Sequence, residues 1–304
     1  MSNQHGNTVK AVIVALIGNL LVAISKFIVF IITSSTAILA ESIHTFADCM
    51  NQVFLLIGNK RSKKQSNELH NFGYKKEAFF WSMLVAVLLF FMGAVFSIYE
   101  GIEKLIHKEP LTNIYWVFIV LAISIPIEYT SFRVALKEFR KTSRKKFLTA
   151  IEESTNSSLM VILLEDFGAL IGLLIVLCST ILSLFNPVFD AIGSIFVGLL
   201  LLLISYKLGN EIRHLITGES IPKEKVNEIT KIIKTNSIIT NINDIKTMVI
   251  GNDAYMVLIS IDIDDEAHGY DIENMIFDLK RHIKSVIPQI DIINIEIKDS
   301  LRNK

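Results

Sequence analysis

The feature that most constrains this chain is a series of long apolar stretches in its first two thirds. A helix needs roughly 20 apolar residues to cross the hydrocarbon core of a bilayer. Six stretches are long enough, at about residues 9–33, 36–58, 79–105, 113–136, 157–184 and 188–206. The chain of 304 residues is 51% hydrophobic with a mean hydropathy of +0.49, which is more apolar surface than one soluble core could bury. The sequence therefore predicts a multi-span α-helical membrane protein with six transmembrane helices.

The basic residues predict how these spans are oriented, because Lys and Arg in short loops are retained in the cytoplasm. The connections after the second and fourth spans are strongly basic: Lys60, Arg61, Lys63, Lys64, Lys75, Lys76, Arg140, Lys141, Arg144, Lys145 and Lys146. The opposite connections hold little besides Lys108. We therefore expect both termini to be cytoplasmic, with the protein in the plasma (inner) membrane if it is bacterial. The formal net charge is zero, so nothing electrostatic favours a nucleic-acid partner.

After Tyr206 the sequence takes on the periodicities of a small soluble domain. Helical spacing is followed by two alternating strands, a second helical stripe and a last alternating strand. The residues that carry these patterns are Val226, Ile229, Ile232, Ile233, Ile245 to Ile250, Tyr255, Val257, Ile259, Ile261, Ile263, Ile272, Met275, Ile276, Leu279, Ile283, Val286, Ile293, Ile295 and Ile297. The order is αββαβ, which predicts a ferredoxin-like α+β domain with helices on an antiparallel sheet. We expect residues 1–206 to form the transmembrane domain and residues 207–304 the cytoplasmic domain.

One face of the second span is polar. Its polar residues fall within about 100° of arc at helical spacing: Glu41, His44, Asp48, Asn51 and Gln52. A charged group near the bilayer centre costs roughly 2.5–3.5 kcal/mol, so this stripe requires a cavity, partners or an ion. His44 and Asp48 are one turn apart and could reach the same ion, and a nitrogen–oxygen donor set suits Zn²⁺ better than Mg²⁺ or Ca²⁺. A simple hydrogen-bonded pair is the alternative interpretation.

The fifth span supplies two further acids, Glu165 and Asp166, in an apolar context. Neighbouring residues on a helix diverge by about 100°, so the two need not face the same ion. We favour Asp166 as a metal ligand and leave Glu165 as a ligand, a proton carrier or a group that orients the ligands. Gly168 and Gly172 would let another helix approach closely. Three acids toward the ends of other spans are expected to form interhelical hydrogen bonds or to reach the membrane surface as snorkelling charges, rather than to act directly in transport: Glu100, Glu128 and Asp190.

Three segments resemble the cation diffusion facilitator family. They are Ser35-Thr-Ala-Ile-Leu-Ala-Glu-Ser-Ile-His-Thr-Phe-Ala-Asp48, His70-Asn-Phe-Gly-Tyr74 and Ile162-Leu-Leu-Glu-Asp-Phe-Gly-Ala-Leu-Ile-Gly172. The sequence is similar to the branch that includes the mitochondrial zinc transporter nine. This resemblance implies a six-helix metal/proton antiporter with a cytoplasmic αββαβ domain for dimerisation and regulation, acting as a homodimer.

The resemblance also implies a set of metal ligands. The family's second-span pair matches His44 and Asp48, and the final acid of its fifth-span motif matches Asp166. The first position of that motif, usually His or Asp, is Ile162 here, so Glu165 or a water molecule has to complete the site. This departure keeps Mn²⁺, Fe²⁺ and Co²⁺ open beside Zn²⁺.

Two secondary metal sites of the family are expected to be missing or weak. A loop site of two histidines would match His70 and Tyr74, so we expect it to be degraded. The α+β domain offers His214, His268 and His282, and we interpret His282 as a packed histidine.

The sequence thus predicts efflux of a divalent transition-metal ion, with zinc favoured, from the cytosol in exchange for protons by alternating access. The metal is cargo, and no resident cofactor or enzymatic activity is expected. An intramembrane metalloenzyme is the first rival, but the spans lack a His-Glu-x-x-His pair. A metal-sensing membrane protein that signals through its C-terminal domain is the second.

Overall fold

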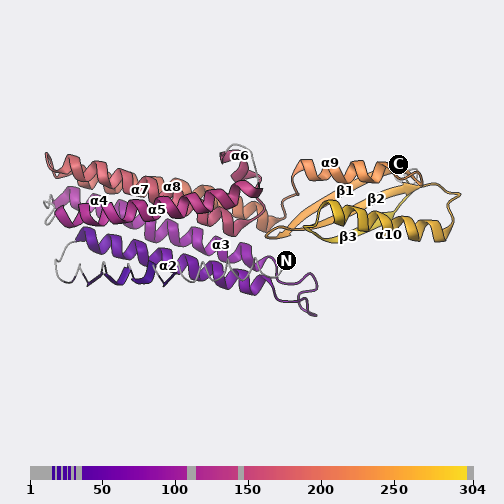
Figure 1. Cartoon of the computed structure of the whole chain (residues 1–304), viewed down its shortest axis with the longest axis horizontal. Helices are drawn as coiled ribbons and strands as arrows, with labels where there is room; N and C mark the ends of the chain where they lie inside the picture. Colours follow the sequence, from indigo (N-terminus) through magenta and orange to yellow (C-terminus); the bar gives the residue numbers. More distant parts are fainter. Residues whose placement is uncertain are drawn as a thin grey trace.

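The computed structural model describes residues 36–107, 114–142 and 147–299, together with isolated positions between 16 and 31. The predicted first span therefore lies largely outside the described residues. The helices of the first part of the chain are α2 (Thr36–Ser62), α3 (Glu77–Leu88), the π-helical segment η1 (Leu89–Val95), α4 (Phe96–His107), α5 (Ile114–Thr142), α6 (Phe147–Glu152), α7 (Ser157–Ser183) and α8 (Val188–Thr217). The long helices lie side by side at one end of an elongated molecule, with a smaller α/β domain at the other end (Figure 1).

Four helical segments of the described chain are long and apolar enough to cross a membrane: Glu77–His107, Val117–Arg140, Ser157–Ser183 and Val188–Thr217. They correspond to the predicted third to sixth spans. The predicted second span forms α2, which is less apolar because the polar stripe lies on it. The predicted class, a multi-span helical membrane protein with a C-terminal α+β domain, is confirmed.

Glycines bring the backbones of α4 and α8 close together. A Cβ atom added at Gly101 would lie 2.8 Å from the Ala191 carbonyl oxygen, and one at Gly198 would lie 2.9 Å from the Ala94 carbonyl oxygen. Contacts this short leave no room for a side chain, so both positions require glycine. This close antiparallel packing brings the last turn of α4 against the first turn of α8.

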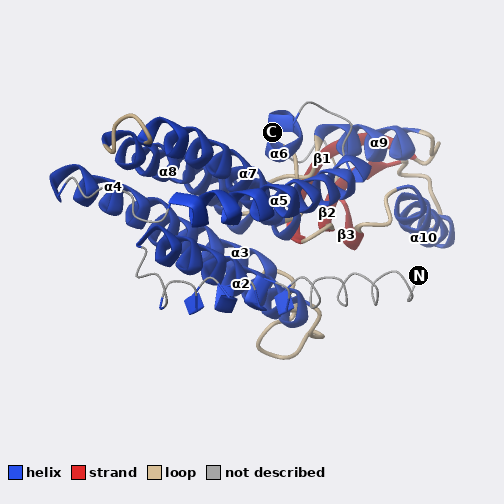
Figure 2. Cartoon of the chain, turned by 60° about the vertical axis from the view of Figure 1, so that its left-hand side comes forward, coloured by secondary structure: helices blue, strands red, loops and turns tan. Residues whose placement is uncertain are grey.

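The C-terminal domain contains α9 (Lys223–Lys234), β1 (Ile239–Gly251), β2 (Ala254–Ile263), α10 (Gly269–Val286) and β3 (Ile290–Ile297). The strands form one sheet in the order β1-β2-β3 (Figure 2). β1 and β2 are antiparallel, whereas β2 and β3 are parallel. The prediction of a fully antiparallel sheet is therefore wrong, because α10 crosses over between β2 and β3 and lets the chain return in the same direction.

Periodicity nevertheless predicted the core of this domain correctly. Tyr255, Val257, Ile259 and Ile261 on β2 are all buried, as the alternating pattern requires. From the helices, apolar residues at helical spacing pack against them: Ile229, Ile233, Met275, Leu279 and Ile283. His282 is exposed, so the interpretation of it as a packed histidine is wrong.

The α/β domain contacts the start of α7 through the turn between β1 and β2. The Asn252 Oδ1 atom accepts hydrogen bonds from the backbone N–H and the hydroxyl of Ser157, each 3.0 Å long. The Asn252 amide donates to Ser158 Oγ at 2.9 Å, and the Asn156 amide donates to Asp253 Oδ2 at 2.8 Å. A membrane-spanning helix that carries two of the predicted site residues thus begins on the C-terminal domain.

Candidate metal site in the helix bundle

The polar stripe of α2 faces the interior of the bundle. Thr45 is buried and Asn51 is 1% exposed, and Asp48 and Thr45 line an internal cavity. His44 lies one turn before Asp48 on the same helix, but its side chain is outside the described residues, as is that of Glu41. The described part of the stripe therefore reaches toward α7, as the sequence predicted.

Glu165 faces α2. The Asn51 amide Nδ2 donates a 2.9 Å hydrogen bond to Glu165 Oε1, and the Asp48 carboxyl group interacts with the same acid. Asn51 Oδ1 is buried and has no hydrogen-bond partner among the described residues. A buried polar atom of this kind costs free energy unless a further group satisfies it. Asn51 Oδ1 could therefore accept a hydrogen bond from a further group bound beside Glu165.

Asp166 turns toward α5 instead. Ser131 Oγ donates a 2.9 Å hydrogen bond to Asp166 Oδ2, and the charge of Asp48 also acts on this carboxyl group. The two adjacent acids thus diverge as expected for neighbours on a helix, yet both lie within the electrostatic range of Asp48. Sequence reasoning missed Ser131, because a lone serine beside Thr130 in a span carries no distinctive signal.

Small residues of α7 make room beside the acids. A Cβ atom at Gly168 would lie 2.7 Å from Ile204 Cδ1 of α8, so the Ile204 side chain occupies the space that this glycine leaves open. At Gly172 the nearest atom is Val197 Cγ1 at 3.7 Å, which is an ordinary contact. Gly168 and Gly172 both line the cavity that reaches Asp48.

The cavity has a volume of about 140 Å³ and lies between α2, α4, α5, α7 and α8. Thr45 and Asp48 of α2 line it, and so do Glu100 and Lys104 of α4 and Asp190 in the first turn of α8. The end of α4 and the start of α8 lie at the end of the bundle far from the α/β domain (Figure 1). Glu128 of α5 also contributes to its wall. The cavity thus extends from Asp48 of α2 toward that end of the bundle, with a lining that is largely apolar between these polar groups.

Among the described side chains, no group of three His, Cys, Asp or Glu residues is arranged to hold a metal ion. Asp48 interacts with Glu165, whereas Asp166 is hydrogen-bonded to Ser131 and feels only the charge of Asp48. Whether His44 joins them lies outside what the structure describes. In the predicted loop site, the His70 and Tyr74 rings are 4.2 Å apart between centroids, and the Tyr74 hydroxyl accepts a hydrogen bond from Asn67.

Comparison with known proteins identifies the family. Residues 12–214 match the family description "Cation efflux transmembrane domain". The chain is 33% identical over 247 residues to the human protein named proton-coupled zinc antiporter SLC30A9, mitochondrial, covering 80% of this chain and 44% of that protein. It is 31% identical over 271 residues to metal tolerance protein C4 of Arabidopsis thaliana, covering 88% of this chain and 59% of the relative.

A more distant relative is the manganese efflux system protein MneP of Bacillus subtilis, 23% identical over 227 residues, with 74% of this chain and 73% of that protein covered. The chain spans about half the length of the human and plant relatives. The matched family comprises membrane transporters of metal cations rather than enzymes. With a family match over more than half of its length, the chain belongs to the cation efflux family, the cation diffusion facilitators.

Proposed function

We propose that this protein exports Zn²⁺ in exchange for protons, taking the ion up on the side of the α/β domain and releasing it at the opposite end of the helix bundle. The observation that carries the proposal is the interaction of Asp48 from α2 with Glu165 from α7, with Asp166 within the electrostatic range of Asp48, inside apolar helices and with Asp48 lining a cavity between them. Carboxylates deep in a bilayer are costly unless they serve an ion or a proton. The name of the human relative, a zinc antiporter, supports the choice of metal.

His44, Asp48 and Asp166 are the proposed ligands, and Glu165 takes the place left open by Ile162. Glu165 suits this role because it already faces Asp48 and because Asn51 fixes its carboxyl group. Binding requires Asp166 to exchange its Ser131 hydrogen bond for the metal. A small rotation of α7 or α5 would move the Asp166 carboxyl group away from Ser131 and toward the metal.

Proton exchange follows from the chemistry of the ligands. A carboxylate or imidazole binds metal through lone pairs that a proton would otherwise occupy. Metal uptake therefore releases protons from these groups, and protonation on the release side displaces the metal. An inward proton gradient would drive the metal outward by this exchange, through alternating access of the site to the two sides.

We further propose that the α/β domain and both termini are cytoplasmic, on the strength of the basic connections near Lys60 and Arg140. If the protein is bacterial, it would then reside in the plasma (inner) membrane. The resemblance to the family also implies a homodimer, and this stays a prediction.

Manganese is the second candidate cargo. The described acids of the site all offer oxygen donors, which suit Mn²⁺ better than they suit Zn²⁺, and one relative is named a manganese efflux protein. Participation of the His44 imidazole in binding would favour zinc.

The binding experiment that tests this proposal uses purified full-length protein in detergent. Isothermal titration with Zn²⁺, repeated in buffers of different ionisation enthalpy, should show one mid-membrane site that releases protons on binding. His44→Ala and Asp48→Asn should each weaken binding at least tenfold, because removing a ligand disrupts the site. Asp265→Asn, on an exposed turn of the α/β domain, is the matched control. Wild-type affinity in both ligand variants would reject the site, and tighter binding of Mn²⁺ than Zn²⁺ would favour the second cargo.

A further inference from the structure

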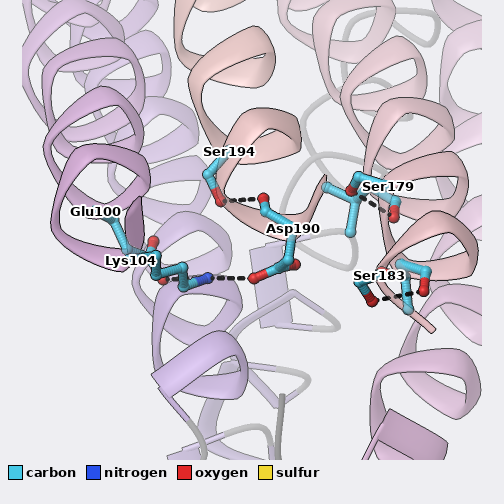
Figure 3. Close-up of polar contacts among 8 residues, drawn as sticks. Glu100, Lys104, Ser179, Ser183, Asp190 and Ser194 are labelled. Atoms are coloured by element: carbon cyan, nitrogen blue, oxygen red, sulfur yellow. Dashed lines mark hydrogen bonds and ion pairs between the residues drawn. The ribbon is translucent and has the colours of Figure 1, made fainter. Parts of the chain in front are cut away.

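Three charged residues meet where α4 and α8 come closest, near the end of the bundle far from the α/β domain. Lys104 Nζ lies 3.1 Å from Glu100 Oε1, one helical turn away, and 3.0 Å from Asp190 Oδ2 on α8. Figure 3 shows the Lys104 side chain extended toward Asp190. The side chains of Lys104, Glu100 and Asp190 are only 19%, 17% and 14% exposed. Two carboxylates thus share one ammonium, which leaves one net negative charge in the cluster.

Helix packing alone does not explain this cluster. Gly101 and Gly198 already hold α4 and α8 in close contact, and a shielded ion pair contributes little net stability because its charges lose their hydration. All three side chains also line the cavity that reaches Asp48. An ion that leaves the proposed site through this cavity must pass them.

A lysine of α8, Lys207, also lies between two carboxylates, but at another place in the bundle. Lys207 Nζ lies 2.8 Å from Glu152 Oε1 and 2.8 Å from Glu211 Oε1. None of these three residues lines the cavity. Lys207 therefore serves as a control for Lys104, because both lysines lie between two carboxylates but only Lys104 lines the cavity.

We propose that Glu100, Lys104 and Asp190 form a transit site for the exiting divalent cation, in which the Lys104 ammonium competes with the metal for the two carboxylates. This inference rests on the proposed export function. The net negative charge attracts the cation into the last part of the cavity. The tethered ammonium then returns to the carboxylates and keeps them from retaining the metal, since an ion must be bound weakly enough to leave.

The test measures inhibition of transport by metal on the release side. Everted membrane vesicles of cells that express the full chain, with the cytoplasmic face outward, are preloaded with increasing Zn²⁺, and initial uptake of added Zn²⁺ is measured. Lys104→Gln should lower the lumenal Zn²⁺ concentration that halves uptake by roughly tenfold or more, because two close carboxylates lose their counter-charge. Lys104→Arg should behave as wild type.

Three further variants separate charge from structure. Asp190→Asn should shift the inhibition in the opposite direction, toward higher lumenal Zn²⁺. The double variant Lys104→Gln with Glu100→Gln restores the net charge and should return inhibition toward the wild-type value. Lys207→Gln, the matched control, should leave it unchanged.

Unchanged inhibition in Lys104→Gln, or an equal shift in Lys207→Gln, would overturn the transit site while leaving export intact. If Lys104→Gln does not reach the membrane, Asp190→Asn decides, and wild-type inhibition in that variant overturns the proposal. Absence of Zn²⁺ uptake by the wild-type protein would instead contradict the export function itself.

Discussion

The two adjacent acids of α7 show how neighbouring side chains take different partners. Glu165 is held by Asn51 of α2, and Asp166 by Ser131 of α5, each at 2.9 Å. One helix therefore presents acids to two neighbours at the same depth. Small helix movements can change which of these partners each acid contacts, and this makes the pair suited to exchanging protons and metal.

Replacing Asn51 should weaken metal binding without removing a ligand. Asn51→Ala deletes the amide that fixes Glu165, and loss of such an orienting partner costs roughly tenfold or more in metal affinity. The zinc concentration that gives half-maximal transport in proteoliposomes should rise accordingly. Asn59→Ala, an exposed asparagine on the same helix, should leave it unchanged. Equal values for both variants would contradict the orienting role.

At the residue scale the sequence could single out candidate site residues, but not the contacts that they make. Asp48, Glu165 and Asp166 could be selected because each is a charge in an apolar span. Their partners could not be assigned, since Asn51 was one polar residue among several in its stripe and Ser131 had no signal of its own. Pairing between helices depends on tertiary packing, which no local pattern encodes.

Among the helices and strands, the contact of α4 with α8 is the packing feature with the clearest consequence. A Cβ atom at Gly198 would lie 2.9 Å from the Ala94 carbonyl oxygen and 2.5 Å from Ile98 Cγ1, whereas Gly209 on the same helix has nothing within 4 Å. We therefore expect an alanine substitution to have opposite effects on protein stability at these two glycines of α8.

Gly198→Ala should destabilise the protein by about 1–3 kcal/mol, because overpacking forces the two helices apart. Gly209→Ala should be neutral or stabilising by up to about 1 kcal/mol, since alanine favours a helix over glycine. Thermal unfolding in detergent measures both, with a fall in Tm of about 2–4 °C per kcal/mol for a chain of this size. A Tm for Gly198→Ala at or above that of Gly209→Ala would contradict the close contact.

The periodicity of the sequence predicted which segments are helices and which are strands, but it did not predict how the strands pair in the sheet. Alternation along Tyr255 to Ile263 correctly predicted a strand and its buried face. The same alternation says nothing about strand direction. The helix expected between the last two strands was the signal for the parallel pairing of β3 with β2, and the prediction of an antiparallel sheet did not use it. The π-helical segment Leu89–Val95 was also unpredictable, because its apolar sequence fits an uninterrupted helix equally well.

Over the whole molecule, the α/β domain and the bundle meet at the helix that carries the two acids. The Asn252 side chain makes three hydrogen bonds to Ser157 and Ser158 at the start of α7. Lys75, in the connection between α2 and α3, forms a 2.7 Å ion pair with Asp291 of the domain. A shift of the domain would therefore be transmitted directly to α7.

Asn252→Ala should loosen the first turn of α7. Loss of these hydrogen bonds costs on the order of 1–3 kcal/mol locally, so amide hydrogen exchange at residues 157–160 should accelerate by roughly tenfold or more. Asn243→Ala, which removes a hydrogen bond to the Lys298 carbonyl oxygen within the domain, should leave α7 unaffected. Equal exchange at α7 in the two variants would mean that the junction does not hold this helix.

In the proposed transport cycle, carboxylates of α2 and α7 bind one cation and exchange it for protons. Simultaneous recording of zinc and proton movement in proteoliposomes tests it most directly, using wild type, Asp48→Asn and Asp166→Asn. We predict zinc flux coupled to proton flux in the opposite direction, with both lost in the two variants. Zinc flux that persists in both variants, or that proceeds without any proton movement, would contradict the claim.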